Sequence, residues 1–355
     1  MICYSDAFRI LKTLRKKTKD IVSPEDFPAF CSSAMDGFLL RAPSNRGKFY
    51  LNRQVAAGND PLEPADDEAI EIMTGAPIYF TGHEAVIRLE DVERFDNYID
   101  TKKAVVVAEN IRMAGSDIEK GQIVLRAGTP IEARHIMMLE ALGVSCKKTR
   151  VAIISTGNEI ANGQIRNSTA PFLEASLAQL GVEILNLGVC PDDANFFDEL
   201  LKRAKDWKAD VIISTGAVSV GAYDFVKSAL QKHDAVIHFH GVAIRPGKPI
   251  LCASVDDTMF FGLPGNPMAS VVGFEFFVKP YLGFESVTKK VKLRREFRKP
   301  KVLRLFCTSL LSGDEVDILD KQASYGVFSF AQSNAWVILP EGIELVKAGE
   351  WVDVL

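Results

Sequence analysis

The region from Arg150 to Gly283 most restricts the fold of this chain, because short apolar stretches alternate there with stretches of helical periodicity. The clearest apolar stretch, residues 211–214, is mostly β-branched and does not alternate with polar residues, as is typical of a strand buried on both faces of a parallel sheet. Alternating strands and helices predict a doubly wound α/β domain over residues 150–284. Its other expected elements are strands at 151–154, 183–187 and 235–239 and helices at 172–180 and 196–204.

The remaining segments predict mainly β structure. Residues 23–121 contain short apolar runs separated by turn-rich loops, which predict a β module inserted near the N-terminus. Residues 285–355 have the same pattern and predict a small C-terminal β domain, in which we see no catalytic chemistry. Residues 1–22 and 122–149 each contain a helical stretch and are expected to form a discontinuous helical and linker domain. The expected fold class is therefore multidomain α/β plus β.

The composition excludes several classes of protein. The 355 residues carry a formal net charge of -4, which gives no electrostatic case for binding nucleic acid. No apolar run approaches the roughly 20 residues of a membrane span, and the N-terminus lacks the shape of a signal peptide. The six cysteines are scattered without a Cys-x-x-Cys pair, so we expect reduced thiols in a cytoplasmic protein.

Three expected strands of the α/β domain end in comparable loops, at residues 156–159, 215–224 and 263–267. The carboxyl ends of parallel strands lie at one edge of a sheet, so we expect these loops to share a crevice, where open α/β sheets bind ligands. Their glycines permit close approach of the backbone to an anion, and Asp224 is placed to hold a divalent cation against a phosphate. Glycine-rich turns after strands also occur without any ligand, and that alternative stays open at this point.

Charged side chains accompany these loops. Arg245 and Lys248 stand beside prolines in residues 243–249, and Glu159 adds a carboxylate at the end of the first loop. Asn266-Pro267 is a good helix start, and amides at a helix start favour an anion. Cations, amides and acids on one rim suit a phosphorylated ligand with a metal ion. A turn-rich region with incidental charges is the competing interpretation.

Two loops of the expected β module also present a carboxylate near glycine. Asp36 lies within residues 32–38, and Asp117 ends residues 111–117. Small neighbouring residues let such a carboxylate stand out from the backbone. The alternative for Asp36 is a simple turn in which the aspartate accepts hydrogen bonds from nearby amides.

Seven short segments, in order along most of the chain, have recognisable sequences. They are Ser33-Ala34-Met35-Asp36-Gly37, Met73-Thr74-Gly75-Ala76-Pro77, Gly115-Ser116-Asp117, Ser155-Thr156-Gly157-Asn158-Glu159, residues 216–224, Pro246-Gly247-Lys248-Pro249 and Leu263-Pro264-Gly265-Asn266-Pro267. No single segment is specific, but the ordered set is. Together the segments resemble the molybdopterin molybdenumtransferase family, to which the E domain of gephyrin also belongs.

The resemblance implies an enzyme that inserts molybdate into adenylated molybdopterin and releases AMP with the help of Mg2+, the last step of molybdenum cofactor synthesis. It also implies a homodimer, with molybdopterin adenylyltransferase and molybdoenzymes as further candidate partners. Carried over by motif, the catalytic residues are Asp36, Asp117, Glu159 and Asp224, and the metal ligands are Glu159, Asp192, Asp193 and Asp224. The substrate-binding residues are Thr74, Ser155, Thr156, Gly157, Thr215, Gly216, Ser219, Gly221, Arg245, Lys248, Pro264, Gly265, Asn266 and Pro267.

The sequence departs from the usual family pattern at several positions. Ala217 replaces a glycine, Asn158 an aspartate and Gly241 a lysine, and Arg245 stands where a later lysine is usual. The stretch after Pro77 lacks the usual Pro-Glu-Gly-Ala-Asp. These changes would weaken the handling of an oxyanion.

Two other functions therefore stay open. The first is adenylyl transfer to molybdopterin, which the flanking β segments disfavour, because that reaction belongs to smaller, single-domain relatives of the α/β unit. The second is a non-catalytic scaffold, which the retained acids Asp36, Asp117, Glu159 and Asp224 disfavour.

Overall fold

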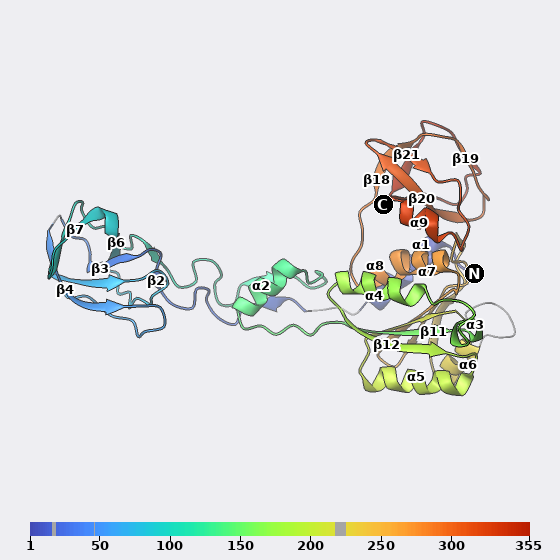
Figure 1. The fold of residues 1–355 in the computed structure, drawn as a ribbon, viewed down its shortest axis with the longest axis horizontal. Coiled ribbons are helices and arrows are strands. Elements are labelled where there is room, and N and C mark those ends of the chain that lie inside the picture. The colour runs from blue at the N-terminus through green and yellow to red at the C-terminus, as the bar shows by residue number, and fades with distance from the viewer. Residues whose placement is uncertain (16–18, 46, 217–224) are drawn as a thin grey trace. The chain divides into compact units, whose positions relative to one another are not determined.

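The computed structural model describes residues 1–15, 19–45, 47–216 and 225–355. The chain forms two compact units. The first contains Met1–Lys17, Pro130–Ala133 and Lys147–Leu355, and the second contains Thr18–Thr129 and Arg134–Cys146. Figure 1 shows the helices and strands of both units. The finer division into four domains expected from the sequence stays a prediction.

A six-stranded sheet in the order β12-β11-β13-β17-β16-β14 forms the centre of the first unit. Its neighbours β12, β11, β13 and β17 all run parallel, which confirms the doubly wound pattern predicted from the alternation of strands and helices. The strands are β11 (Arg150–Thr156), β12 (Glu183–Cys190), β13 (Val211–Thr215), β14 (Val236–His240), β16 (Leu251–Val255) and β17 (Thr258–Leu263).

The sheet is mixed rather than wholly parallel, because β16 and β17 form a hairpin. Val255 pairs with Thr258, so only Asp256 and Asp257 lie between the two strands. Asp256 has a φ of 51°, the left-handed conformation that tight hairpin turns require and that aspartate tolerates better than most residues. This turn reverses the chain without a crossover helix.

Helices cover both faces of the sheet, as Figure 1 shows. Apolar side chains of α1, α4 and α7 lie in a core on one face, and those of α5 and α6 lie in a core on the other. The helices of this unit are α1 (Tyr4–Leu14), α3 (Asn158–Ala161), α4 (Thr169–Gln179), α5 (Ala194–Asp206), α6 (Phe225–Lys232), α7 (Pro267–Gly273), η2 (Phe274–Val278), α8 (Lys279–Tyr281) and α9 (Val327–Gln332).

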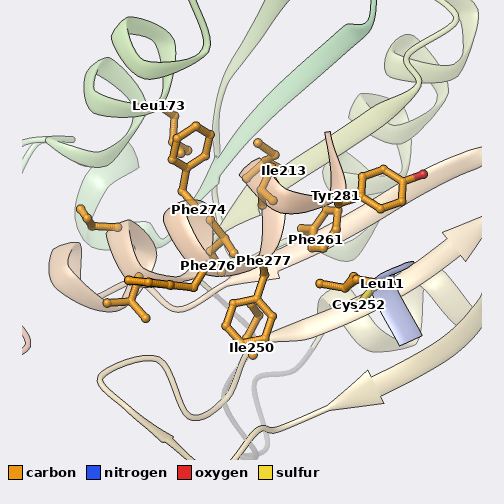
Figure 2. Close-up of a cluster of buried hydrophobic side chains, with 14 of the residues drawn as sticks. Leu11, Leu173, Ile213, Ile250, Cys252, Phe261, Phe274, Phe276, Phe277 and Tyr281 are labelled. Carbon is orange, nitrogen blue, oxygen red and sulfur yellow. The ribbon is translucent and has the colours of Figure 1, made fainter. Parts of the chain in front are cut away.

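Aromatic rings fill much of the larger core (Figure 2). Phe274 and Phe277 of η2 share one buried cluster with Ile213 and Phe261 of the sheet. Leu11 of α1 is buried in the same cluster, so the amphipathic N-terminal helix is part of this core. Truncating one such ring to alanine typically costs about 3–5 kcal/mol, so this cluster is a major source of stability.

The last part of the first unit is a closed β barrel. Its sheet has the order β15-β20-β21-β18-β24-β22, and β22 also pairs with β20, which closes the ring. Along β18 Val291 and Leu293 are buried while Lys290 and Lys292 are exposed, as the alternating sequence predicts. The barrel strands are β15 (Ile244–Arg245), β18 (Lys289–Leu293), β20 (Arg304–Ser312), β21 (Glu315–Ile318), β22 (Ala335–Leu339) and β24 (Trp351–Val354). A separate ribbon joins β19 (Phe297–Arg298) to β23 (Leu345–Val346).

The second unit contains a six-stranded sheet in the order β6-β3-β5-β4-β8-β7. Alternate residues of β3 enter two different cores, Phe38 and Leu40 one and Leu39 the other, so both faces of this strand are buried. The strands are β3 (Gly37–Arg41), β4 (Lys48–Val55), β5 (Glu68–Ile72), β6 (Glu84–Arg88), β7 (Val92–Arg94) and β8 (Tyr98–Thr101), with a short helix η1 (Leu89–Asp91).

Two small ribbons and one helix complete this unit. The ribbons join β1 (Ile21–Val22) to β10 (Ile123–Leu125) and β2 (Ser32–Ser33) to β9 (Ile111–Arg112), and the helix is α2 (Ala133–Ala141). Across both units, the described part of the chain contains no helix with the length and apolar character needed to cross a membrane.

Candidate active site

The carboxyl ends of β11, β13 and β17 converge at one edge of the central sheet. The Thr156 hydroxyl donates to the Thr215 carbonyl at 2.9 Å, and the Gly216 amide donates to the Leu263 carbonyl at 2.9 Å. Gly216 has a φ of 87°, and a Cβ there would lie 2.6 Å from the Thr156 carbonyl oxygen. Only glycine permits this approach of two loops. The described starts of the three predicted loops therefore meet.

Several of the predicted site residues are buried at the ends of these strands, beneath the loops. Ser155, Thr156 and Thr215 are buried, and the Ser155 hydroxyl accepts from the Asn167 side-chain amide at 2.8 Å. Gly265 is exposed beside Gly216, and a Cβ on Gly265 would lie only 3.5 Å from the Gly216 Cα. Ser219, Gly221 and Asp224 lie outside the described residues, as does Ala217.

The loop after β11 presents an exposed carboxylate, that of Glu159. Gly157 has a φ of 135°, and a Cβ on it would lie 2.6 Å from a Glu159 carboxylate oxygen. The carboxylate therefore lies back over the glycine. The amide of Gly157 donates to the Cys190 carbonyl at 3.1 Å, which joins this loop to the end of β12.

Asn158 joins the loop after β11 to the loop after β12. Its side-chain oxygen accepts from the Asp192 amide at 3.0 Å, so the residue that replaces a family aspartate retains an acceptor at this position. Asp193 is the N-cap of α5, and its carboxylate accepts from the amides of Asn195 and Phe196 at 2.7 and 2.9 Å.

These acids provide an incomplete set of metal ligands. In the described ranges, no group of three or more His, Cys, Asp or Glu side chains is placed to hold a metal ion. The Asp193 carboxylate is engaged as a helix cap, whereas those of Glu159 and Asp192 have no side-chain partner among the described residues. Carboxylate oxygens are ligands that suit Mg2+, so the chemistry of these two side chains fits that ion.

The cationic loop at residues 243–249 is fixed from two sides. The Ala243 amide donates to the Ile2 carbonyl at 2.8 Å, and the Ala243 carbonyl accepts from the Arg304 amide at 3.0 Å. The side chains of Arg245 and Lys248 are exposed and form no ion pair within the described part of the chain. Two cations thus lie on a rigid loop with their charges available.

An ion pair lies behind this loop. The Arg304 guanidinium stands 4.7 Å from the centre of the Tyr4 ring and contacts one Glu341 carboxylate oxygen, Oε2, at 3.0 Å. The other oxygen of Glu341, Oε1, is buried and has no hydrogen-bond partner among the described residues. Burial raises the pKa of Tyr4 to about 12, although the nearby Arg304 charge opposes this shift. The contact of Arg304 with the Tyr4 ring joins the N-terminal helix to the C-terminal barrel.

A small cavity, partly open to solvent, adjoins the cationic loop, and sequence reasoning missed it. Pro246 and Met268 contribute to its wall from the α/β side, and Lys321 contributes an exposed ammonium group from the C-terminal region. The other lining residues are Phe306, Thr308, Gln322, Ala323, Gly326 and Trp336. These residues are far apart in the sequence and no local motif marks them, which is why the sequence gives no sign of chemistry in the C-terminal region.

The start of α7 has the predicted cap and two engaged amides. Pro267 occupies the first turn and Asn266 is the N-cap, as predicted. However, the Met268 amide donates to the Ser324 carbonyl at 3.0 Å, and the Ala269 amide donates to the Asn266 carbonyl at 3.0 Å. The C-terminal region and a turn thus already satisfy these two amides, and an anion at this helix start stays a prediction.

In the second unit the structure brings Asp36 and Thr74 together. One Asp36 carboxylate oxygen accepts from the Thr74 amide at 2.7 Å and from the Thr74 hydroxyl at 2.9 Å. These two hydrogen bonds lower the pKa of the exposed Asp36 carboxyl. The competing interpretation, an aspartate bonded only within its own turn, is incorrect, since the donor lies 38 residues away.

Asp117 stands on a neighbouring segment of the same unit. Its loop follows β9, which pairs with β2 through Ser33 and Ile111. The Asp117 amide donates to the Phe27 carbonyl at 3.1 Å, and its side chain is exposed. The loops that carry Asp36 and Asp117 are therefore both anchored on the β2–β9 ribbon.

The stretch after Pro77 contains a buried carboxylate that sequence reasoning missed. Glu84 is fully buried and accepts hydrogen bonds from the Thr81 hydroxyl at 2.6 Å and the His83 amide at 3.2 Å. Burial raises the pKa of Glu84, but the hydrogen bonds outweigh burial and lower it. Glu84 thus fixes this loop internally, although the usual family sequence is absent.

Comparisons with known proteins match nearly the whole length of the chain. A family described as "probable molybdopterin binding domain" matches residues 152–283. The MoeA N-terminal region (domain I and II) matches residues 12–143, and the MoeA C-terminal region (domain IV) matches residues 290–355.

Individual relatives are similar over almost the full chain. The molybdopterin molybdenumtransferase of Synechococcus elongatus is 34% identical over 370 residues, which cover 96% of this chain and 91% of the relative. That of Bacillus subtilis is 33% identical and covers 95% of this chain and 86% of the relative. The crystal structure of the molybdopterin biosynthesis MoeA protein from Pyrococcus horikoshii OT3 has a TM-score of 0.65 and 26% identity, and the match covers 100% of this chain and 99% of that one. The chain belongs to the molybdopterin molybdenumtransferase family.

Proposed function

We propose that this chain inserts molybdate into adenylated molybdopterin and releases AMP, which completes synthesis of the molybdenum cofactor. The full-length similarity to enzymes with the molybdenumtransferase name supports this assignment. The structural observation that carries it is the rim from Gly216 through Gly265 and α7 to the cationic loop at 243–249. Gly247 has a φ of 103°, and a Cβ on it would lie 3.4 Å from the Ala269 carbonyl oxygen, so the loop passes close against α7.

The rim suits a pyrophosphate group. Arg245 and Lys248 offer two cations that no described acid neutralises, and Gly216 and Gly265 let a ligand approach the backbone. The phosphate of AMP gains negative charge as the pyrophosphate bond breaks. Cations fixed beside that charge stabilise it more in the transition state than in the bound substrate. An oxygen of water forms the new bond to the phosphorus that AMP leaves, so no covalent nucleophile of the protein is needed for this step.

Molybdate is proposed to enter through the cavity beside Pro246. The cavity adjoins the cationic loop, and Lys321 and Thr308 give it a cation and a hydroxyl. Gln322 is already engaged, since its side-chain amide donates to the Thr308 and Leu319 carbonyls at 2.9 and 2.7 Å. Lys321 is therefore the more available group for an oxyanion in this pocket.

Mg2+ is the proposed resident metal, with Glu159 and Asp192 as ligands and Asp224 joining them by the family pattern. We prefer Asp192 to Asp193 because the Asp193 carboxylate caps α5. When bound, the ion would neutralise phosphate charge during release of AMP. Asn158 supports this arrangement by holding the backbone of Asp192.

A cytoplasmic homodimer is the proposed working form, with molybdopterin adenylyltransferase and molybdoenzymes as transient partners. All six cysteines are free, which suits a reducing compartment. Apolar side chains on the second unit, Ile136 and Met137 of α2 and Ile123 of β10, are 41%, 76% and 44% exposed. Exposed apolar residues of this kind suit a subunit interface.

The decisive experiment supplies purified protein with adenylated molybdopterin, Mg2+ and molybdate. We expect AMP release together with a product that activates a molybdenum-free molybdoenzyme, and neither should occur without molybdate or without the protein. Formation of adenylated molybdopterin from ATP and molybdopterin would instead indicate an adenylyltransferase. Binding of adenylated molybdopterin without turnover would indicate a scaffold.

A further inference from the structure

The outer face of β4 and β8 in the second unit carries exposed aromatic rings. Tyr50 and Tyr98 lie directly opposite each other in the antiparallel register. The Phe95 ring stacks on Tyr98, with 4.4 Å between ring centres and 13° between ring planes. Tyr50 is 43% exposed and Phe95 is 38% exposed. We name Tyr50, Tyr98, Phe95, Lys48, Glu93 and Asp100 the β4–β8 face.

The charges on the β4–β8 face are arranged unfavourably. Asp100 lies directly opposite Lys48 on one side and directly opposite Glu93 on the other. Lys48 forms no ion pair with Asp100, and its ammonium group stands 3.6 Å from the centre of the Tyr98 ring. Two exposed carboxylates thus face each other, and neither forms an ion pair with a described residue; like charges directly opposite each other destabilise a sheet.

The reverse side of the same strands is firmly packed. Phe49 of β4, Ile99 of β8 and Val92 of β7 belong to one buried cluster. The sheet therefore holds the β4–β8 face in place before any partner arrives. A preformed face loses little conformational freedom on binding.

We propose that the β4–β8 face binds an extended segment of a partner protein that carries arginine at alternate positions. One guanidinium would lie between Glu93 and Asp100, and the next would displace the Lys48 ammonium from its face of the Tyr98 ring, whose other face is stacked on Phe95. Asp100 and Tyr98 are two residues apart on one strand, so their side chains project from one face about 6.8 Å apart. Alternate side chains of an extended segment repeat at the same distance, which matches the two positions.

The choice of arginine follows from the two kinds of group on the β4–β8 face. The two carboxylates require a cation, and the position of Lys48 shows that the Tyr98 ring accepts one. Arginine serves both groups, because its planar guanidinium pairs with carboxylates through paired hydrogen bonds and stacks on aromatic rings. Nucleic acids and anionic lipid surfaces carry the wrong charge for Glu93 and Asp100.

A pair of peptides with identical composition tests the spacing. Acetyl-Arg-Thr-Arg-Thr-amide presents arginine at alternate positions, and acetyl-Arg-Arg-Thr-Thr-amide does not. Titration calorimetry of the full chain at low ionic strength should give roughly fivefold tighter binding of the alternating peptide, a factor in keeping with one stacked guanidinium. Equal affinity for both peptides would mean attraction by charge alone and would overturn the proposal.

Three variants locate the binding site. Glu93→Gln/Asp100→Asn should abolish the preference for the alternating peptide, and it should fold, because it removes a repulsion. The matched control Glu25→Gln/Glu140→Gln makes the same charge change at two exposed acids outside the β4–β8 face and should keep the preference. Lys48→Met should tighten binding several-fold, because it removes a competing cation. A preference retained in the first variant, or lost in the control, would refute this location.

The chain itself provides one competing occupant, since its basic β18 strand carries charge complementary to the β4–β8 face. Sedimentation of the wild type and of Glu93→Gln/Asp100→Asn separates the two cases. The proposal requires the same oligomeric state for both proteins. A change of state in the variant would assign the β4–β8 face to a second copy of the chain and would overturn a separate partner.

Discussion

At the scale of single residues, the hydrogen bonds between Thr74 and Asp36 make a measurable prediction. Both bonds go to one carboxylate oxygen and lower its pKa. Thr74→Ala removes the hydroxyl donor, so the pKa of Asp36 should rise toward the usual value of about 3.9. A carboxyl whose pKa is lower in the folded state stabilises the fold above its unfolded pKa and loses that contribution as the pH falls. NMR titration of the Asp36 carboxyl carbon measures the change, and an unaltered midpoint would contradict it.

The carboxylates of Glu159 and Asp224 test the proposed chemistry. Glu159→Gln and Asp224→Asn should abolish molybdate insertion, because each removes a charged oxygen ligand for Mg2+. Glu159 is exposed, so its replacement should change the free energy of unfolding by no more than about 0.5 kcal/mol. AMP release and urea denaturation are measured on the same samples. Asp193→Ala is the structural comparison, since it removes the side-chain acceptor and should weaken the N-cap of α5 by about 1 kcal/mol.

At the scale of elements, Arg304 of β20 contacts three parts of the first unit. They are Tyr4 of α1, the loop at residues 243–249 and Glu341 of the C-terminal region. Arg304→Met would leave the Glu341 carboxylate without its cation, and one oxygen of that carboxylate is already buried without a partner among the described residues. We expect a loss of about 1–3 kcal/mol in the free energy of unfolding. Arg294→Met, which breaks surface pairs with Glu315 and Asp317, should cost less than about 1 kcal/mol. Equal costs in urea denaturation would mean that the Arg304 pair is no more important than a surface pair.

The sequence predicted elements well where periodicity is strong and local. β13 and α5 follow directly from their apolar patterns, and Gly216 sits where a strand-end loop was expected. The reversal at Asp256 depends on a two-residue turn, and the engaged amide of Met268 depends on a contact with Ser324. Such contacts between distant segments leave no periodic signal. The cavity beside Pro246 was missed for the same reason.

At the scale of the whole molecule, the predicted acids are divided between the two compact units. Asp36 and Asp117 belong to the second unit, whereas Glu159 and Asp224 belong to the first. If these acids act on one substrate, the two units must cooperate, either within one chain or across a dimer. A two-fold interface gives each of two identical sites one unit from each chain. We predict the shared arrangement, with Asp36 of one chain serving the site that contains Asp224 of its partner.

Co-refolding of two inactive proteins distinguishes these arrangements. Asp36→Ala and Asp224→Ala should each be inactive alone. Random pairing makes about half of the dimers mixed, and each mixed dimer has one site with both acids, so activity should recover to roughly a quarter of wild type. Were both acids supplied by the same chain, every site would lack one of them and the mixture would stay inactive. Differently tagged chains show that mixed dimers have formed, so an inactive mixture that contains them would rule out the shared site.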